Sequence, residues 1–273
     1  MKYKAVVFDL DDTLVWDERI SRQALMEAAA EASARTGADT GRLAAEAKRV
    51  AEELWHAHAP VERCDALGIV AFEGMWGFFH GEDDYLRHLR EWVPGFRTEI
   101  WRRALAAEGI QDEVLAEELG ALFQRRRREL QDPLPGAAVV LHVLREAGLK
   151  IGLLTNGAPD LQWEKIEASG LGMLFDAAVV SGELGTGKPD PAIFHHLLEI
   201  LGVQSGDALM VGNSLSRDIV GGRCAGMATC WLALEGEDEP VGLVEPDFTI
   251  RSLAELPPLV LQGTGTGSSS AGT

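Results

Sequence analysis

The stretch Phe8-Asp9-Leu10-Asp11-Asp12-Thr13-Leu14 follows directly on the apolar run Ala5-Val6-Val7. Such a run is typical of a buried strand. Buried strands do not normally end in three carboxylates, because burying charge is costly without a cation or hydrogen-bond donors. Residues two apart in an extended segment face the same way, so Asp9 and Asp11 lie close together. The string therefore predicts a metal or phosphate site, in which these two aspartates divide the roles of nucleophile and proton carrier. A solvated acidic turn is the alternative interpretation.

Length and composition limit the classes of protein that fit. The 273 residues are enough for one large or two modest domains, and 46% hydrophobic with 25% charged residues argues against general disorder. A formal net charge of -18 argues against nucleic acid polymers and membrane surfaces as partners, since both require basic patches. No signal peptide and no apolar stretch long enough to span a bilayer is visible. Three cysteines at irregular spacing form neither a zinc pattern nor a disulfide framework. We therefore expect a cytoplasmic protein with reduced thiols.

The composition changes along the chain. From residue 15 to about 132 the sequence is rich in Ala, Glu and Arg, and its periodicity predicts helices over about 21–37, 40–57, 83–92, 98–108 and 112–130. Pro133, Pro135 and Gly136 then mark a boundary. The last eleven residues, 263–273, contain only Gly, Thr, Ser and Ala, which is the composition of a flexible tail.

Beyond residue 133 helices and strands alternate. Strands are predicted over 150–154, 177–181, 208–211 and 229–233, with helices over 137–147, 191–201 and 218–225. Strands separated by helical crossovers indicate a parallel sheet covered on both faces. The predicted fold is therefore an α/β, Rossmann-like core formed by residues 1–14 and 133–262, with residues 15–132 inserted as an α-helical cap.

Four polar strings follow four predicted strands, and ligands of open α/β sheets bind at that end. After the first string come Thr155-Asn156-Gly157, then Gly185-Thr186-Gly187-Lys188-Pro189, then Gly212-Asn213 with Asp218 five residues on. Singly, each string is an ordinary turn, helix start or loop. Together they place carboxylates, an amide oxygen, a hydroxyl and a lysine at one sheet edge, which suits Mg²⁺ and a phosphoryl group.

With these strings in this order, the chain resembles the haloacid dehalogenase (HAD) superfamily of phosphohydrolases. The resemblance covers residues 1–14 and about 133–234, and by position and length the helical insertion is similar to the family's cap. It implies that Asp9 attacks phosphorus to form an aspartyl-phosphate and that Asp11 serves as general acid and then base. It further implies that Thr155, the N–H of Asn156 and Lys188 bind the phosphoryl oxygens.

The metal site implied by the resemblance departs from the family's usual pattern at one position. Mg²⁺ would contact the Asp9 carboxylate, the backbone carbonyl of Asp11 and the side chain of Asn213, while Asp218 would supply charge through a water. The family usually has an acidic residue where this chain has Asn213. An amide oxygen carries no charge, so weaker metal binding is expected here.

The resemblance predicts a phosphatase acting on a small phosphorylated metabolite, such as a sugar phosphate, a nucleotide monophosphate or a phosphoacid. The placement of the insertion is similar to that in phosphoglycolate phosphatases, nucleotide 5′-monophosphatases and N-acylneuraminate-9-phosphatases. A haloacid dehalogenase, a phosphosugar mutase and a weakly active binding protein are alternatives, although Asp11 argues against the first. Among the cap tryptophans, Trp16 is the candidate for the substrate pocket, because it follows the catalytic loop. Neither the substrate nor the oligomeric state can be predicted.

Overall fold

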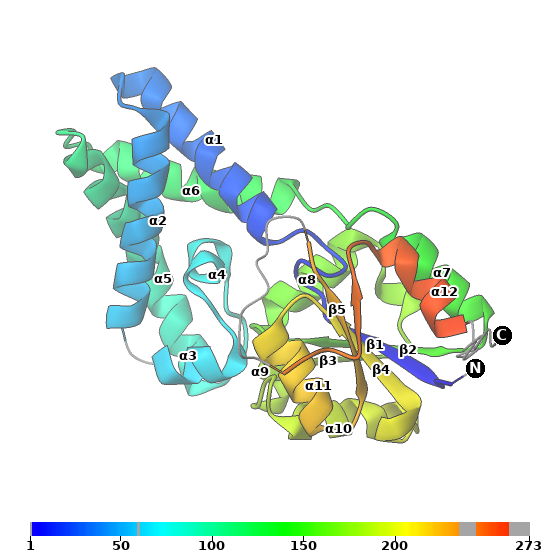
Figure 1. Cartoon of the computed structure of the whole chain (residues 1–273). Coiled ribbons are helices and arrows are strands. Elements are labelled where there is room, and N and C mark those ends of the chain that lie inside the picture. Colours follow the sequence, from blue (N-terminus) through cyan, green and yellow to red (C-terminus); the bar gives the residue numbers. More distant parts are fainter. Residues whose placement is uncertain (1, 59–60, 235–243, 262–273) are drawn as a thin grey trace.

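The computed structural model describes residues 2–58, 61–234 and 244–261, and within them a parallel sheet forms the core (Figure 1). The strands, in the spatial order β3-β2-β1-β4-β5-β6, all run parallel to their neighbours. Their bounds are β1 Ala5–Phe8, β2 Lys150–Thr155, β3 Ala177–Val180, β4 Ala208–Gly212, β5 Ala228–Leu232 and β6 Phe248–Ile250. This confirms the predicted fold class.

Strand β1 lies in the centre of the sheet although it is first in the chain. Phe8 pairs with Leu153 of β2 and with Val211 of β4, so these strands end at the same level. The N–H of Asp9 continues the ladder to the carbonyl of Val211 at 3.0 Å. The polar strings after the three central strands consequently meet at one edge.

Helices cover both faces of the sheet. On one face, α7 (Ala137–Glu146) and α12 (Leu256–Leu261) pack on alternate residues of β1, including Val6 and Phe8. On the other, α10 (Pro191–Leu201) packs on Val7. The remaining helical segments of this part of the chain are α8 Pro159–Ser169, α9 Ser181–Leu184, the π-helical segment Leu215–Ile219 and α11 Val220–Cys224. Three single-turn 3₁₀ segments, at Gly172–Leu174, Ser205–Asp207 and Leu253–Glu255, complete the described part of it.

The insertion after β1 is entirely helical and forms a second body beside the sheet (Figure 1). Its helices are α1 Glu18–Thr36, α2 Thr40–Ala57, α3 Val61–Leu67, α4 Ala71–Trp76, α5 Asp84–Ala107 and α6 Glu113–Glu129. They share a hydrophobic cluster of their own, which Ala158 and Leu161 join from the sheet side. Two chain segments connect the bodies, with Leu134 N–H donating to the Leu14 carbonyl at 2.8 Å. The domain boundaries near residues 14 and 133 stay predictions.

Three details differ from the sequence prediction. The predicted helices over 83–92 and 98–108 are one helix, α5, which runs through Pro94. Buried residues on both sides of the proline, including Val93 and Phe96, pack on neighbouring cap helices, and this tertiary packing outweighs the missing N–H. The short helices α3 and α4 and the strand β6 were not predicted. The predicted flexible tail, 263–273, lies outside the described residues.

A membrane-spanning helix is not found in the parts of the chain that the structure describes, since none of their helices is both long and apolar enough.

Candidate active site

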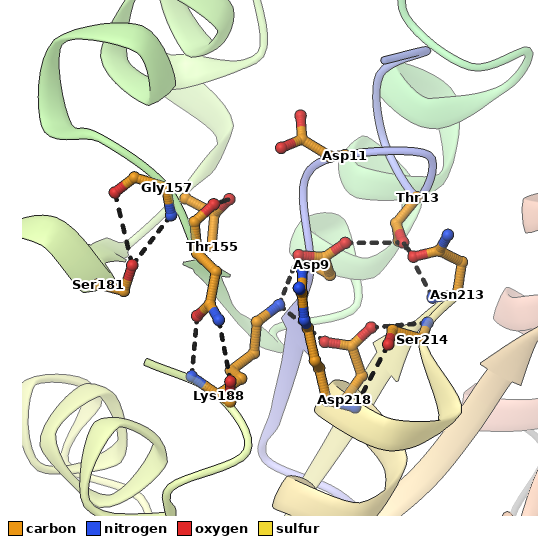
Figure 2. Close-up of polar contacts among 12 residues, drawn as sticks. Asp9, Asp11, Thr13, Thr155, Gly157, Ser181, Lys188, Asn213, Ser214 and Asp218 are labelled. Atoms are coloured by element: carbon orange, nitrogen blue, oxygen red, sulfur yellow. Dashed lines mark hydrogen bonds and ion pairs between the residues drawn. The ribbon is translucent and has the colours of Figure 1, made fainter. Parts of the chain in front are cut away.

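Lys188 bridges two carboxylates at the carboxyl edge of the sheet (Figure 2). Its Nζ lies 2.5 Å from Oδ1 of Asp9 and 2.7 Å from Oδ1 of Asp218. All three side chains are buried. The three residues come from different segments, and Lys188 lies 179 positions from Asp9 and 30 from Asp218 in the chain. The structure thus brings together three residues that the sequence predicted for the site.

Asn156 holds the loop that carries Lys188. Its side-chain Nδ2 donates to the carbonyl of Lys188 at 2.9 Å, and its Oδ1 accepts from the backbone N–H of Lys188 at 2.8 Å (Figure 2). The approach is close because residue 187 is glycine: a Cβ there would lie 2.7 Å from the Ala66 carbonyl and 3.0 Å from Nδ2 of Asn156. The side chain of Asn156 therefore builds the site, in addition to the backbone N–H that the resemblance implies.

Thr13 links the first string to the last. Its hydroxyl donates to Oδ2 of Asp9 at 3.2 Å and accepts from the backbone N–H of Asn213 at 3.1 Å. Oδ1 of Asn213 lies 3.4 Å from the same hydroxyl, so the free oxygens of Asp9 and Asn213 face one region. Asp218 is bound more tightly, because its Oδ2 accepts the Ser214 N–H at 3.0 Å while Oδ1 accepts Lys188.

Lys188 stays protonated in this setting. Burial lowers the pKa of a lysine, but Asp218 and Asp9 oppose it and raise the pKa of Lys188 above its ordinary value. For Asp9 burial is the largest influence and raises its pKa, although Lys188 pulls in the opposite direction. A further cation near Oδ2 of Asp9 would complete the neutralisation that burial demands.

A pocket of about 270 Å³ opens over these residues. Six carboxyl groups but only two cationic side chains line it; the lining residues are Asp9, Asp11, Asp12, Asp17, Gly68, Val70, Glu73, Asn156, Lys188, Asn213, Ser214, Arg217 and Asp218. Within the described residues no three His, Cys, Asp or Glu side chains converge closely enough to hold a metal by themselves. The excess of carboxylates, together with the neutral oxygen of Asn213, nevertheless forms an oxygen-rich donor set that fits Mg²⁺.

Two predicted residues lie outside this lining. Thr155, at the end of β2, is buried, and its hydroxyl lies 3.4 Å from the carbonyl of Asn156. Gly157, two residues after Thr155, donates its N–H to Oγ of Ser181 at 2.9 Å. Trp16 packs against the hydrophobic cluster under α7, with Arg19 over its ring. Trp16 is not among the residues that line the pocket for which it was predicted.

Asp11 belongs to a different group of contacts from Asp9. Its carboxylate accepts from Nε2 of Gln162 at 3.0 Å and from Nζ of Lys165, which lies 2.9 Å from both oxygens. Gln162 and Lys165 lie one helical turn apart on α8, and both are buried. The two aspartates of the first string therefore have separate cationic partners.

The cap surrounds Lys165 with further charges. Its Nζ lies 2.8 Å from Oδ1 of Asp17 and 3.8 Å from Oε1 of Glu73 on α4. Asp17 also accepts from Arg127, a fully buried residue of α6. Burial alone would raise the pKa of Asp17, but Lys165 and Arg127 together lower it to about 2. This carboxylate is therefore ionised throughout the neutral range.

Sequence analysis missed Gln162, Lys165 and Glu73. A signal for the first two exists, because they share the helical spacing of the buried residues Leu161 and Ile166 of α8. Polar residues at core-facing positions of a helix require partners. For Glu73 the chain offers no comparable pattern.

The titration of Glu73 predicts a pH-dependent stability. Burial is the largest influence and raises its pKa from 4.5 to about 8. Between these values the folded protein holds a proton that the unfolded chain has lost, so the free energy of unfolding falls as pH rises, by up to about 1.4 kcal/mol per pH unit. We expect Glu73→Gln to remove that part of the fall and to melt above the wild type at pH 8. Thermal unfolding from pH 5 to 8 measures this.

The exposed Glu62 provides the control, since Glu62→Gln should leave the pH dependence of the melting temperature unchanged. Parallel wild-type and Glu73→Gln curves over the whole interval would contradict the prediction.

The structure is thus an α/β protein with a buried carboxylate–lysine pair at the carboxyl edge of its parallel sheet, beside a helical cap. A profile of the haloacid dehalogenase-like hydrolases matches residues 3–226. The chain belongs to this family, as the resemblance of its four strings implied.

Curated relatives extend over nearly the whole chain. A phosphoserine phosphatase of Thermus thermophilus is 36% identical over 262 residues, covering 93% of this chain and 97% of the relative. The N-acylneuraminate-9-phosphatase of Mus musculus is 30% identical over 263 residues, covering 95% and 94% respectively.

Solved structures share the fold. The putative HAD-hydrolase YfnB from Bacillus subtilis, described as bound to magnesium, aligns with a TM-score of 0.64 at 22% identity and covers 96% of this chain and all of that one. An L-2-haloacid dehalogenase from Xanthobacter autotrophicus aligns with a TM-score of 0.58 at 22% identity, covering 95% and 99%. At these identities the alignments bear on the architecture alone.

Proposed function

We propose that this hydrolase is a Mg²⁺-dependent phosphatase that acts on a small phosphomonoester through an aspartyl-phosphate. The observation that carries the proposal is the buried Asp9–Lys188 pair, 2.5 Å apart, at the floor of a pocket of about 270 Å³. The family and the phosphatases among its relatives support a phosphoric monoester hydrolase. The cytoplasmic location and the absence of nucleic acid partners stay predictions from composition.

In the first step Asp9 supplies the nucleophile. An oxygen of its carboxylate bonds to phosphorus as the bond to the leaving oxygen breaks, and Asp11 gives that oxygen a proton. In the second step water attacks the phosphorus of the aspartyl-phosphate and passes a proton to Asp11. Phosphate leaves, and both side chains return to their starting states.

Lys188 stabilises the charge that develops on the phosphoryl oxygens. Its ammonium already lies beside Asp9, so a phosphoryl group attached there stays within its reach. Asp218 and the Asn156 side chain fix the position of that ammonium before substrate binds, and such preorganisation is what makes electrostatic stabilisation effective. We retain the backbone N–H of Asn156 and the hydroxyl of Thr155 as proposed phosphoryl ligands, the latter after a rotation of its side chain.

Asp9, the carbonyl of Asp11 and the side chain of Asn213 would hold Mg²⁺, with Asp218 contributing through a water. When bound, the ion neutralises phosphoryl charge and holds the phosphoryl group in line with the nucleophile. Asp218 suits an indirect role, because both of its carboxylate oxygens are already hydrogen-bonded. Thr13 orients the two direct side-chain ligands, since its hydroxyl contacts both.

The variant Asn213→Asp should bind Mg²⁺ more tightly, because a carboxylate replaces a neutral amide oxygen in the donor set. We expect the Mg²⁺ concentration for half-maximal hydrolysis to fall about tenfold, equivalent to about 1.4 kcal/mol. The rise of the melting temperature with Mg²⁺ concentration gives a second readout that does not depend on turnover.

Ser216→Asp, an added carboxylate at an exposed site of the same segment, controls for net charge. An unchanged Mg²⁺ dependence in Asn213→Asp, in both assays, would remove residue 213 from the metal site.

The experiment that tests the function is a phosphatase screen with Mg²⁺. Phosphoserine, N-acylneuraminate 9-phosphate, nucleoside monophosphates and sugar phosphates form the panel, and release of inorganic phosphate is measured. We expect at least one small phosphomonoester to be turned over. Halide release from 2-chloropropionate without Mg²⁺ would indicate a dehalogenase, an isomerised sugar phosphate would indicate a mutase, and no turnover by folded protein would favour a binding protein.

A further inference from the structure

The carboxyl group of Asp11 points away from the Asp9–Lys188 pair (Figure 2). It contacts α8 instead, through Gln162 and Lys165. Three distances, 3.0, 2.9 and 2.9 Å, fix its position and the plane of its two oxygens. The side chain of Asp11 still lines the pocket and is 26% exposed. Oδ2 accepts from both Gln162 and Lys165, whereas Oδ1 accepts from Lys165 alone, so the second lone pair of Oδ1 remains available to a reacting group.

Gln162 connects this carboxyl group to the loop that follows β2 and carries Asn156. The same amide nitrogen that donates to Asp11 also donates to the carbonyl of Asn156. Room for the contact depends on Gly157, where a Cβ would lie 2.3 Å from that nitrogen. The side chain of Gln162 therefore links the carboxyl group of Asp11 to the backbone of Asn156.

Lys165 is held in turn by the cap. Asp17, just before α1, forms an ion pair with its ammonium at 2.8 Å, and the Trp76 ring of α4 lies 5.9 Å from it. The ammonium group therefore donates to both oxygens of one carboxylate while a second carboxylate attracts it from the cap side. The position of Lys165 is therefore fixed by partners on both the sheet side and the cap side.

The competing explanation is that Lys165 only stabilises the fold as part of a buried ion cluster. Arg127 is an example of a residue with that role. Arg127 is fully buried in the same cluster, binds Asp17 and donates to Oγ of Ser21 at 3.0 Å. It does not contact Asp11. Lys165 differs from Arg127 because its ammonium donates to both carboxylate oxygens of Asp11, the proposed proton carrier.

We propose that Lys165, together with Gln162, is a positioning residue that orients the Asp11 carboxyl group for proton transfer to and from the leaving oxygen. The proposal rests on the proposed phosphatase function, in which Asp11 is the proton carrier. Fixing this orientation lowers the barrier only where the leaving oxygen requires a proton as its bond to phosphorus breaks.

The test compares two leaving groups in the variant Lys165→Met. p-Nitrophenyl phosphate releases a weakly basic phenolate that requires no proton, whereas the alkyl phosphate that the screen finds to be turned over fastest releases a basic alkoxide. We expect kcat for the alkyl phosphate to fall about 100-fold and kcat for the aryl phosphate less than about 5-fold, with KM nearly constant. Asp11→Asn should show the same pattern with a larger effect.

Arg127→Met is the matched control, because it removes a buried cation from the same cluster without touching Asp11. It should lower the melting temperature while leaving the ratio of alkyl to aryl rates at the wild-type value. Equal loss of both rates in Lys165→Met would show a structural role and overturn the proposal. Equal loss in Asp11→Asn would overturn it too, because no proton carrier would remain to be positioned.

If Lys165→Met does not fold, Gln162→Met tests the same idea without leaving an unpaired buried charge. It keeps the ion pair and removes one donor to Asp11, so we expect about a 10-fold selective loss for the alkyl phosphate. An unchanged rate ratio would overturn the proposal. A folded wild type that hydrolyses no phosphomonoester would instead refute the phosphatase function, and the positioning role with it.

Discussion

Replacing Asp9 with asparagine is expected to abolish turnover of p-nitrophenyl phosphate in the presence of Mg²⁺, with a loss of at least about 10⁴-fold in kcat/KM. An amide cannot form the aspartyl-phosphate, and no other carboxylate accepts the Lys188 ammonium from that position. Folding should survive, because Asp218 still pairs with Lys188 at 2.7 Å. Rates of phosphate release and far-ultraviolet circular dichroism measure the two outcomes.

The control for Asp9→Asn is Asp207→Asn, which removes an aspartate from an exposed pair with Lys4. It should keep full activity, since surface ion pairs contribute little to stability. Undiminished turnover in Asp9→Asn would remove Asp9 from the nucleophile role and with it the mechanism proposed above.

Lys188→Met should have the second largest effect, because it acts on both stability and chemistry. Without the ammonium, the buried carboxylates of Asp9 and Asp218 face each other unpaired, which costs about 3–5 kcal/mol. Activity should fall about 10³-fold, as expected when a preorganised stabiliser of transition-state charge is lost. Denaturant unfolding and aryl phosphate hydrolysis measure these losses.

The double variant Lys188→Met/Asp218→Asn separates the two effects. Removing the second carboxylate relieves the repulsion, so stability should return most of the way to the wild-type value while activity stays low. If Lys188→Met alone were as stable as the wild type, the bridging position of Lys188 would have no energetic role. If the double variant regained activity, Lys188 would not act on the phosphoryl group.

The pocket also shows how the cap enters the site. Glu73 of α4 contributes to its lining, together with Gly68 and Val70 from the turn between α3 and α4. A Cβ on Gly68 would lie 2.7 Å from Cβ of Asn156, so the cap backbone closely approaches the loop that follows β2. This short cap segment therefore lies beside the residues proposed for catalysis.

The sheet edge was predictable from sequence because its determinants are local and repetitive. An apolar β-branched run defines each central strand, parallel topology aligns the strand ends, and polar residues follow at once. Asp9, Lys188 and Asp218 could be assigned to one site in this way, although they are far apart in the chain. The alternation of strands and helices likewise determined the core and the helical insertion.

Tertiary structure decided what local pattern leaves open. The two predicted helices on either side of Pro94 became one because their buried faces pack on the rest of the cap, which the proline signal does not encode. Trp16 is half-buried against the hydrophobic cluster under α7, because apolar area is buried wherever packing allows it.

The contacts of Asp11 were also decided by the tertiary structure. Lys165 lies 154 positions from Asp11 in the chain, and Arg127 lies 106 from Ser21. The sequence determined that a carboxylate would stand near the sheet edge at residue 11, because this residue follows the end of β1 closely, but the expectation that it faces the same way as Asp9 was wrong (Figure 2). Only the tertiary structure decided which cation contacts it, since this ion pair depends on how α8 packs beside the segment that follows β1.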